Sequence, residues 1–460
     1  MLRRKTNQLD MLHGPLLSKI ILFALPLMVT STLQQIFNAT DVAVVGQFAG
    51  SQALAAVGSN SPIINLIINL LIGLSMGANV VIANYIGQGR KDRIKDTVHT
   101  AILISLIGGV AFGVLGIFVS RPMLVAMGSP DDVIDLATLY LRIFFAGLPM
   151  MSLYNFCSSI MRSKGDTMRP LIALAISGVI NVGLNLLLVA VFHMSVAGVA
   201  IATVTANTIS AIMLVVMLVK EEGEFHLDFR KLRLHRDHFK RILQIGVPSG
   251  VQGMVFSLSN VFIQSAVNSF GSAAIAGSSA ALTFEYFAYF ALNAFVQTAM
   301  TFTSQNYGAL EMKRCRDVYL RCMICGVIAV VICNSAFFFG RVFFIGLFTD
   351  SAEVAEWGYT RMACVLIFQW IALSYEVSAA AMRGMGHSTL PALITVIGTC
   401  LLRIAWVFTV FPKSHSFELL MHIYPITWTV TGIAMLIAYF VIRHKEEERI
   451  ALYSLMRADL

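Results

Sequence analysis

Three long stretches of the chain contain no Asp, Glu, Lys or Arg, and they limit the possible fold more than any other feature. They cover residues 42–89, 171–219 and 242–284. A helix needs about 20 apolar residues to cross a bilayer, so each stretch is long enough for two crossings and must contain a turn. Turn-forming residues place these turns near 46–50, 193–198 and 269–272. The chain is therefore predicted to be an all-α integral membrane protein.

Composition excludes the soluble classes of protein. Hydrophobic residues make up 57% of the chain and charged residues 13%, whereas a soluble domain has about 25% charged residues. The chain contains no Walker or HExxH motif. We therefore expect no enzyme activity, no cofactor and no metal-dependent chemistry, and any pumping must use an ion gradient.

Twelve membrane-spanning helices follow from the same pattern along the whole chain. They are predicted at residues 16–45, 52–83, 94–119, 132–161, 168–192, 196–219, 241–268, 274–305, 314–338, 352–382, 389–411 and 419–442. Lys and Arg mark cytoplasmic loops, and nearly all of them fall in the two tails, the 220–241 segment and the turns after even-numbered helices. Both termini are therefore expected in the cytoplasm. This topology also explains the net charge of +8, so no nucleic-acid partner is expected.

The two halves of the chain resemble each other at a shift of 221–222 residues. The matching pairs include Pro26 and Pro248, Gly50 and Gly271, Gly87 and Gly308, Arg93 and Arg314, and Pro170 and Pro391. Each half has six helices, so the halves should share one orientation and be related by an axis along the membrane normal. The predicted parts are tails at 1–15 and 443–460, lobes at 16–219 and 241–442, and a linker at 220–240. Two such bundles suit a transporter that works by alternating access.

Polar residues of the first lobe suggest where an ion would bind, because an ionisable residue at membrane depth is costly and is a functional candidate by default. Asp41 shares one face of the first helix with Gln34 and Asn38, at spacings of i, i+4 and i+7. The predicted cation-coupling residues are Asp41, Asn181, Asn185 and Thr203. Their oxygens suit a small hard cation, or hydrogen bonds to a protonated acid. The alternatives are a structural Asp that caps the next turn and polar contacts between helices.

The second lobe has different candidates. Glu285 stands in an aromatic run at 284–290, which would suit a lipophilic cation or serve only as packing. Glu376 and Arg403, on neighbouring predicted helices, are expected to form a buried ion pair, either functional or structural. Arg142 and Arg361 lie in the outer thirds of their predicted helices, and both are expected to extend their charges to the outer membrane surface.

Several motifs together resemble the multidrug and toxic compound extrusion (MATE) family of cation-coupled efflux transporters, over nearly the whole chain. They are Pro26, the Gln34–Asn38–Asp41 pattern followed by Val-Val-Gly46, residues 53–58, residues 161–170 and residues 304–309. The resemblance implies two six-helix lobes around a central cavity, and antiport of a substrate against protons or sodium. It assigns coupling to Asp41, with Asn181, Asn185 and Thr203 as neighbours. Position 185 is commonly Asp in the family and is Asn here.

The expected substrate is a small lipophilic organic cation. The candidate substrate-binding residues are Gln34, Phe37, Asn38, Asn155 and Glu285. A lipid-linked sugar flippase of the same architecture is the runner-up, although it should line its cavity with several Arg or Lys. A channel or a membrane-embedded enzyme is disfavoured by the long apolar helices and the missing motifs.

We expect a monomer in the bacterial inner (cytoplasmic) membrane, with no metal other than sodium at the Asp41 cluster.

Overall fold

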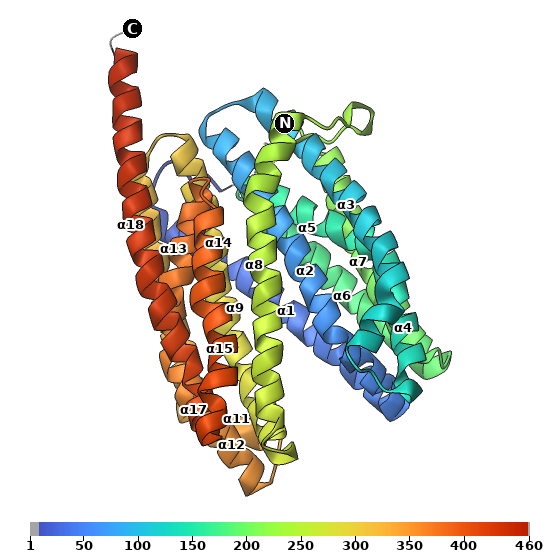
Figure 1. Ribbon diagram of the computed structural model, residues 1–460. Helices are drawn as coiled ribbons and strands as arrows, with labels where there is room; N and C mark the ends of the chain where they lie inside the picture. Colours follow the sequence, from blue (N-terminus) through green and yellow to red (C-terminus); the bar gives the residue numbers. More distant parts are fainter. Residues whose placement is uncertain (1–8, 459–460) are drawn as a thin grey trace. The chain divides into compact units, whose positions relative to one another are not determined.

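The computed structural model describes residues 9–458, and in that range the chain is helical and contains no strand (Figure 1). The first half comprises α1 (Leu16–Phe48), α2 (Gly50–Gly87), α3 (Lys91–Ala126), α4 (Asp131–Ala146), α5 (Leu148–Ser163), α6 (Met168–Asn185), the π-helical turn η1 (Leu186–Val191) and α7 (Ser195–Val219). Two 3-10 turns, η2 (Gly223–Phe225) and η3 (Phe229–Lys231), follow in the linker. The first eight residues of the predicted N-terminal tail and the last two of the C-terminal tail lie outside the described residues.

The second half repeats this plan with more interruptions. It comprises α8 (Arg236–Asn268), α9 (Ser272–Gly308), α10 (Met312–Phe339), α11 (Arg341–Gly346), α12 (Ala352–Val365), η4 (Leu366–Ile371), α13 (Ala372–Gly384), α14 (Thr389–Thr395), the π-helical turn η5 (Val396–Leu401), α15 (Leu402–Thr409), α16 (Phe411–Ser414), α17 (Phe417–Met421) and α18 (Ile423–Ala458). Several of these elements form two longer helices, because η4 joins α12 to α13 and η5 joins α14 to α15.

Twelve long helical segments, as predicted, account for the described residues. Ten helices are long and apolar enough to cross a membrane, and the pair α4 and α5, bent by 47°, makes an eleventh span. The twelfth segment is α9, which is 37 residues long and carries Glu285 among its many Ser and Thr residues. The all-α fold is therefore confirmed, while the cytoplasmic position of the termini stays a prediction.

The internal repeat extends to the backbone of the turns. Gly50 and Gly271, at the two matching helix–helix turns, have φ angles of +86° and +92°. Gly165 and Gly386, another matched pair, have φ angles of +93° and +92°. Glycine adopts such angles without the steric cost that a Cβ atom would impose, so the same turn residue is needed at both positions of each pair.

Internal contacts divide the chain into two units that exchange their first helical segments. The N-terminal unit contains Leu25–Gly250 with Leu9 and Asp10, and the C-terminal unit contains Met11–Ala24 with the chain from Val251 onward. Helices α1 and α8 thus belong to both units, and each changes unit within a few residues of a proline, Pro26 or Pro248. A proline removes one helical hydrogen bond and favours a bend. The lobe boundaries expected at 219–220 and 240–241 stay a prediction.

Small residues bring two helices of the N-terminal unit into backbone contact. A Cβ atom at Gly73 of α2 would lie 2.2 Å from the backbone nitrogen of Gly250, and one at Gly77 would lie 2.2 Å from the carbonyl oxygen of Ile242. Close approach through small residues is a common way for membrane helices to associate. The start of α8 is therefore packed directly on α2.

Candidate functional site

The four residues predicted to couple transport to an ion meet in the N-terminal unit. Asp41 lies near the end of α1, and its two carboxylate oxygens accept hydrogen bonds from two different helices. The Asn185 amide nitrogen donates to Asp41 Oδ1 over 2.5 Å, and the Thr203 hydroxyl donates to Oδ2 over 3.2 Å. The same Asn185 nitrogen lies 3.2 Å from Asn181 Oδ1. The carboxylate therefore has neutral partners only among the residues that the structure describes.

Helix geometry explains why these side chains meet. Asn181 and Asn185 are four residues apart on α6, so they lie on one face of that helix. Both are buried, and the π-helical turn η1 begins directly after Asn185. Such turns interrupt the regular hydrogen-bond ladder and occur often at functional sites. Within the described chain, the Asn185 side-chain oxygen is buried and has no hydrogen-bond partner, so this amide still has an unused acceptor.

The predicted substrate-binding residues of this unit lie in different surroundings. Gln34 and Asn38 are exposed on α1, one turn apart. Phe37 packs against α6 instead, because a Cβ atom at Gly178 would lie only 1.8 Å from its ring. Asn155 of α5 is half-buried and donates to the carbonyl of Met151 over 2.9 Å. Gln34 and Asn38 thus remain open for contact with a ligand, whereas Phe37 helps to hold α1 on α6.

The C-terminal unit contains a buried ion pair that the sequence did not predict. The Arg361 guanidinium donates to Glu285 through Nε over 2.6 Å and through Nη2 over 3.0 Å, and its Nη1 donates to Ser278 over 2.8 Å. The Gln369 amide donates to the carbonyl of Glu285. The prediction that Arg361 extends to the membrane surface is wrong, because only 2% of this residue is exposed. A two-pronged contact of this kind suits the planar guanidinium.

Glu285 therefore has a different environment from the one expected of a substrate ligand. It is 6% exposed and already neutralised by Arg361. The neighbouring Phe284 is buried against the rings of Phe337 and Phe344. The side chain of Tyr286, by contrast, is 42% exposed and stacks on Phe290. The aromatic run is thus mainly packing at its start, and it leaves Tyr286 accessible.

The predicted ion pair between Glu376 and Arg403 is not formed in the described structure. Arg403 is 1% exposed and donates to Thr427 over 3.3 Å and to Asn260 over 3.2 Å. Its guanidinium also lies 4.6 Å from the ring centre of Tyr424. The π-helical turn η5 ends two residues before Arg403. An added residue in such a turn changes which face of the helix the later side chains occupy, and the sequence-based pairing assumed a regular α-helix.

Two of the sequence motifs hold chain segments in place near the helix ends. In the loop between α5 and α6, Lys164 lies 2.8 Å from Glu221, and Arg169 contacts both Glu221 and Asp166. Burial lowers the pKa of Lys164 and raises the pKa of Asp166. Burial alone would raise the pKa of Glu221, but hydrogen bonds from Lys164 and Arg169 outweigh it and hold that pKa below its usual value. The charged residues of this motif therefore tie the 5–6 loop to the start of the linker.

The motif at residues 304–309 also holds a chain segment in place, in the C-terminal unit. The Asn306 amide donates to the carbonyl of Met11 over 3.2 Å, and Arg314 Nη2 donates to the same carbonyl over 3.2 Å. Arg314 also donates through Nε to Asn306 over 3.0 Å. Met11 is fully buried, so these contacts anchor the segment that leads into α1.

Comparison with known proteins gives one family and consistent relatives. The sequence pattern of the MatE family matches residues 26–187 and again residues 248–409. The probable multidrug resistance protein YoeA of Bacillus subtilis is 28% identical over 82% of each chain. The multidrug export protein MepA of Staphylococcus aureus is 21% identical over 75% of this chain and 76% of its own. The two matched ranges are offset by the spacing of the internal repeat.

Solved structures show the same fold. A structure described as MATE in the bent conformation superposes with a TM-score of 0.86 at 20% identity, and the match covers 94% of this chain and 96% of that one. At this identity the likeness concerns the fold, and it agrees with two six-helix halves. The lipid-linked sugar flippase considered from the sequence has no support among these relatives.

Proposed function

Because the chain belongs to the MatE family, we propose that it exports drugs as a secondary active transporter, taking up a proton or a sodium ion in exchange for a lipophilic organic cation. The names of YoeA and MepA, which describe multidrug resistance and export, support the drug-export part of this proposal. The expected location is the bacterial cytoplasmic membrane, crossed many times.

The observation that carries the coupling proposal is the Asp41 carboxylate. It lies in a membrane-spanning helix, it accepts hydrogen bonds from Asn185 and Thr203, and the described chain offers it no ion-pair partner. A charged group at this depth is costly unless it is paired. A mobile cation can supply the missing charge, and a proton, a sodium ion and an organic cation would then compete for one carboxylate. This competition is what exchange of ion for drug requires.

The two candidate ions demand different rearrangements. For a proton, Asp41 becomes a hydrogen-bond donor and needs an acceptor. Rotation of the Asn185 amide would present its unpaired oxygen to the new hydroxyl group. For sodium, several oxygens must converge, and those of Asp41, Asn181, Asn185 and Thr203 are the available ligands. Both ions would bind within the same cluster of residues, so only transport measurements distinguish proton coupling from sodium coupling.

The organic-cation part of the proposal rests on the exposed polar face of α1. Gln34 and Asn38 offer neutral hydrogen-bonding groups one turn apart, and Asn38 is followed by Asp41 within the next turn. The charge of Arg361 is already matched by Glu285. An amide-lined surface that leads to one carboxylate favours a cation over an anion.

The test uses purified protein in sealed vesicles. Ethidium efflux is followed while a proton gradient and a sodium gradient are imposed one at a time. We expect one gradient to drive efflux, and Asp41→Asn to abolish it with normal expression. Asp135→Asn is the matched control, because Asp135 is an exposed acid paired with Arg121 at a helix end. Gradient-driven efflux by Asp41→Asn at the wild-type rate would refute the assignment, and export of anions alone would refute the substrate class.

A further inference from the structure

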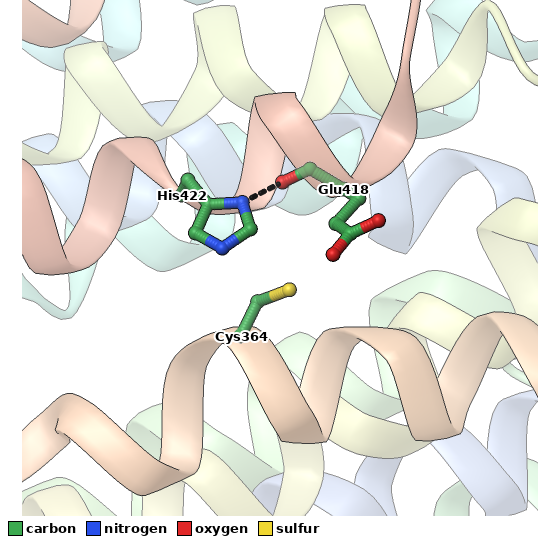
Figure 2. A group of neighbouring side chains, drawn as sticks. All are labelled: Cys364, Glu418 and His422. Carbon is green, nitrogen blue, oxygen red and sulfur yellow. Dashed lines mark hydrogen bonds between the residues drawn. The ribbon is translucent and has the colours of Figure 1, made fainter.

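Three side chains with metal-binding groups meet in the C-terminal unit, beginning one helical turn after Arg361 on α12. Cys364 lies on α12, Glu418 on α17, and His422 directly follows α17. One ligand atom from each residue can be chosen so that all three atoms lie within 4.8 Å of one another. Figure 2 shows the thiol, the carboxylate and one ring nitrogen turned toward a common space. No motif in the sequence predicts this site, because Cys364 is far from the other two residues along the chain.

The hydrogen bond of His422 leaves the second ring nitrogen available. Nδ1 lies 2.8 Å from the backbone carbonyl oxygen of Glu418, and a carbonyl can only accept, so Nδ1 carries the proton. In the neutral ring, Nε2 then has a free lone pair. Histidines that bind metals commonly donate their other N–H to a carbonyl or carboxylate, which orients the ring. His422 therefore has the tautomer and the support that a ligand needs.

Packing between α12 and α17 holds the three groups in place. Glu418 and His422 are four residues apart, so they project from the same side of the chain. The rings of Trp357 and Phe417 meet edge to face, with centres 4.9 Å apart, and this contact joins the two helices one to two turns from Cys364. Cys364 is 6% exposed, whereas Glu418 is exposed and His422 is half-buried. An ion could thus enter from the side of Glu418 and reach the buried thiol.

We propose that Cys364, Glu418 and His422 form a binding site for a divalent transition metal of the zinc class. A thiolate, an imidazole and a carboxylate are all established zinc ligands, and three of them leave a fourth position for water. Tetrahedral zinc needs ligand atoms about 3.5 Å apart, which a small side-chain rotation supplies from the observed spacing. The thiolate excludes sodium and magnesium as preferred occupants, since these ions select oxygen ligands. The Cys364 thiol releases its proton to water on binding, so affinity should fall as the pH falls.

This site shares no residue with the proposed transport site. It joins α12 to α17 within one unit, and its ligand set differs from the oxygen-only cluster at Asp41. A metal that binds only the folded protein stabilises it by an amount that grows with the logarithm of the free metal concentration above the dissociation constant. Metal binding can therefore be measured on the full chain without any transport assay.

The test is the melting temperature of the purified full-length protein in detergent, measured with increasing Zn²⁺ and again with Co²⁺. We expect Zn²⁺ to raise the melting temperature, and Co²⁺ to produce a sulfur-to-metal absorption band. Cys364→Ser, Glu418→Gln and His422→Gln should each weaken Zn²⁺ binding by at least about tenfold. The cobalt band should disappear in Cys364→Ser. Glu418→Gln changes an exposed side chain, so it keeps the test decisive if Cys364→Ser does not fold.

Two matched controls separate this site from other metal-binding side chains. Cys333→Ser removes a half-buried thiol of α10, and His415→Gln removes an exposed imidazole close to α17. Both variants should bind Zn²⁺ as the wild type does. The proposal is overturned if the wild type shows no Zn²⁺-dependent shift up to millimolar concentration, or if the three ligand variants keep the wild-type response.

Discussion

Asp41 in the N-terminal unit and Glu285 in the C-terminal unit are both carboxylates in membrane helices, but their partners differ. Asp41 accepts hydrogen bonds from the neutral groups of Asn185 and Thr203, whereas Glu285 forms a two-pronged ion pair with Arg361. At the repeat position of Asp41, the C-terminal half has the buried, apolar Ile263. Two similar helical units thus use a carboxylate in two ways. Among the described residues, one carboxylate has no ionic partner, and the other is paired with Arg361.

The largest expected difference concerns stability. Arg361→Met should lower the free energy of unfolding by about 3–5 kcal/mol, because it leaves the buried Glu285 charge without a partner. Asp41→Asn should cost less than about 1 kcal/mol, because an amide keeps the shape and removes a charge that has no ionic partner. Denaturant unfolding of both variants in detergent measures the difference. Adding Glu285→Gln to Arg361→Met should restore part of the loss, and equal losses in Arg361→Met and Asp41→Asn would contradict the comparison.

A second variant should give Asp41 an environment like that of Glu285, in which a fixed positive charge faces the carboxylate. Thr203→Lys places an ammonium group beside Asp41, which should form a fixed ion pair and reduce ion-driven efflux at least about tenfold, or roughly 1.4 kcal/mol. The measurement is ethidium efflux under the gradient that drives the wild type. Thr203→Ser keeps the hydroxyl donor and should transport normally. Wild-type efflux by Thr203→Lys would mean that Asp41 need not exchange its charge with a mobile ion.

The smallest expected effect is a coupling near zero between Glu376 and Arg403. Because Arg403 donates to Thr427 and Asn260, a double-mutant cycle with Glu376→Gln and Arg403→Gln should give additive losses within about 0.5 kcal/mol. Unfolding of the two single variants and the double variant provides the cycle. An interaction energy above about 1 kcal/mol would show that the two charges pair after all.

The helical plan could be predicted from the sequence because it depends on local properties of the chain. Charge-free runs of sufficient length predict spans, and the turns near Gly50 and Gly271 follow from residues that end a helix. The repeat is likewise visible in the sequence itself, and it reappears in the two ranges of the MatE pattern. The meeting of Asp41 with Asn181 and Asn185 was also within reach, because the two amides share a helical face and the resemblance to the MATE family placed them beside Asp41.

The contacts between distant segments were decided only by the tertiary structure. Arg361 pairs with Glu285, which is 76 positions away in the sequence. Arg403 does not pair with Glu376 in the described structure. Cys364 lies beside Glu418 and His422 because α12 packs on α17. Each outcome depends on how far a helix is rotated about its own axis, and for Arg403 the π-helical turn that ends at Leu401 changes that rotation. A periodic pattern of apolar residues predicts that a helix exists. Because the helices of this chain are apolar on nearly every side, the pattern does not predict how each helix is rotated. Packing against the neighbouring helices decides that rotation.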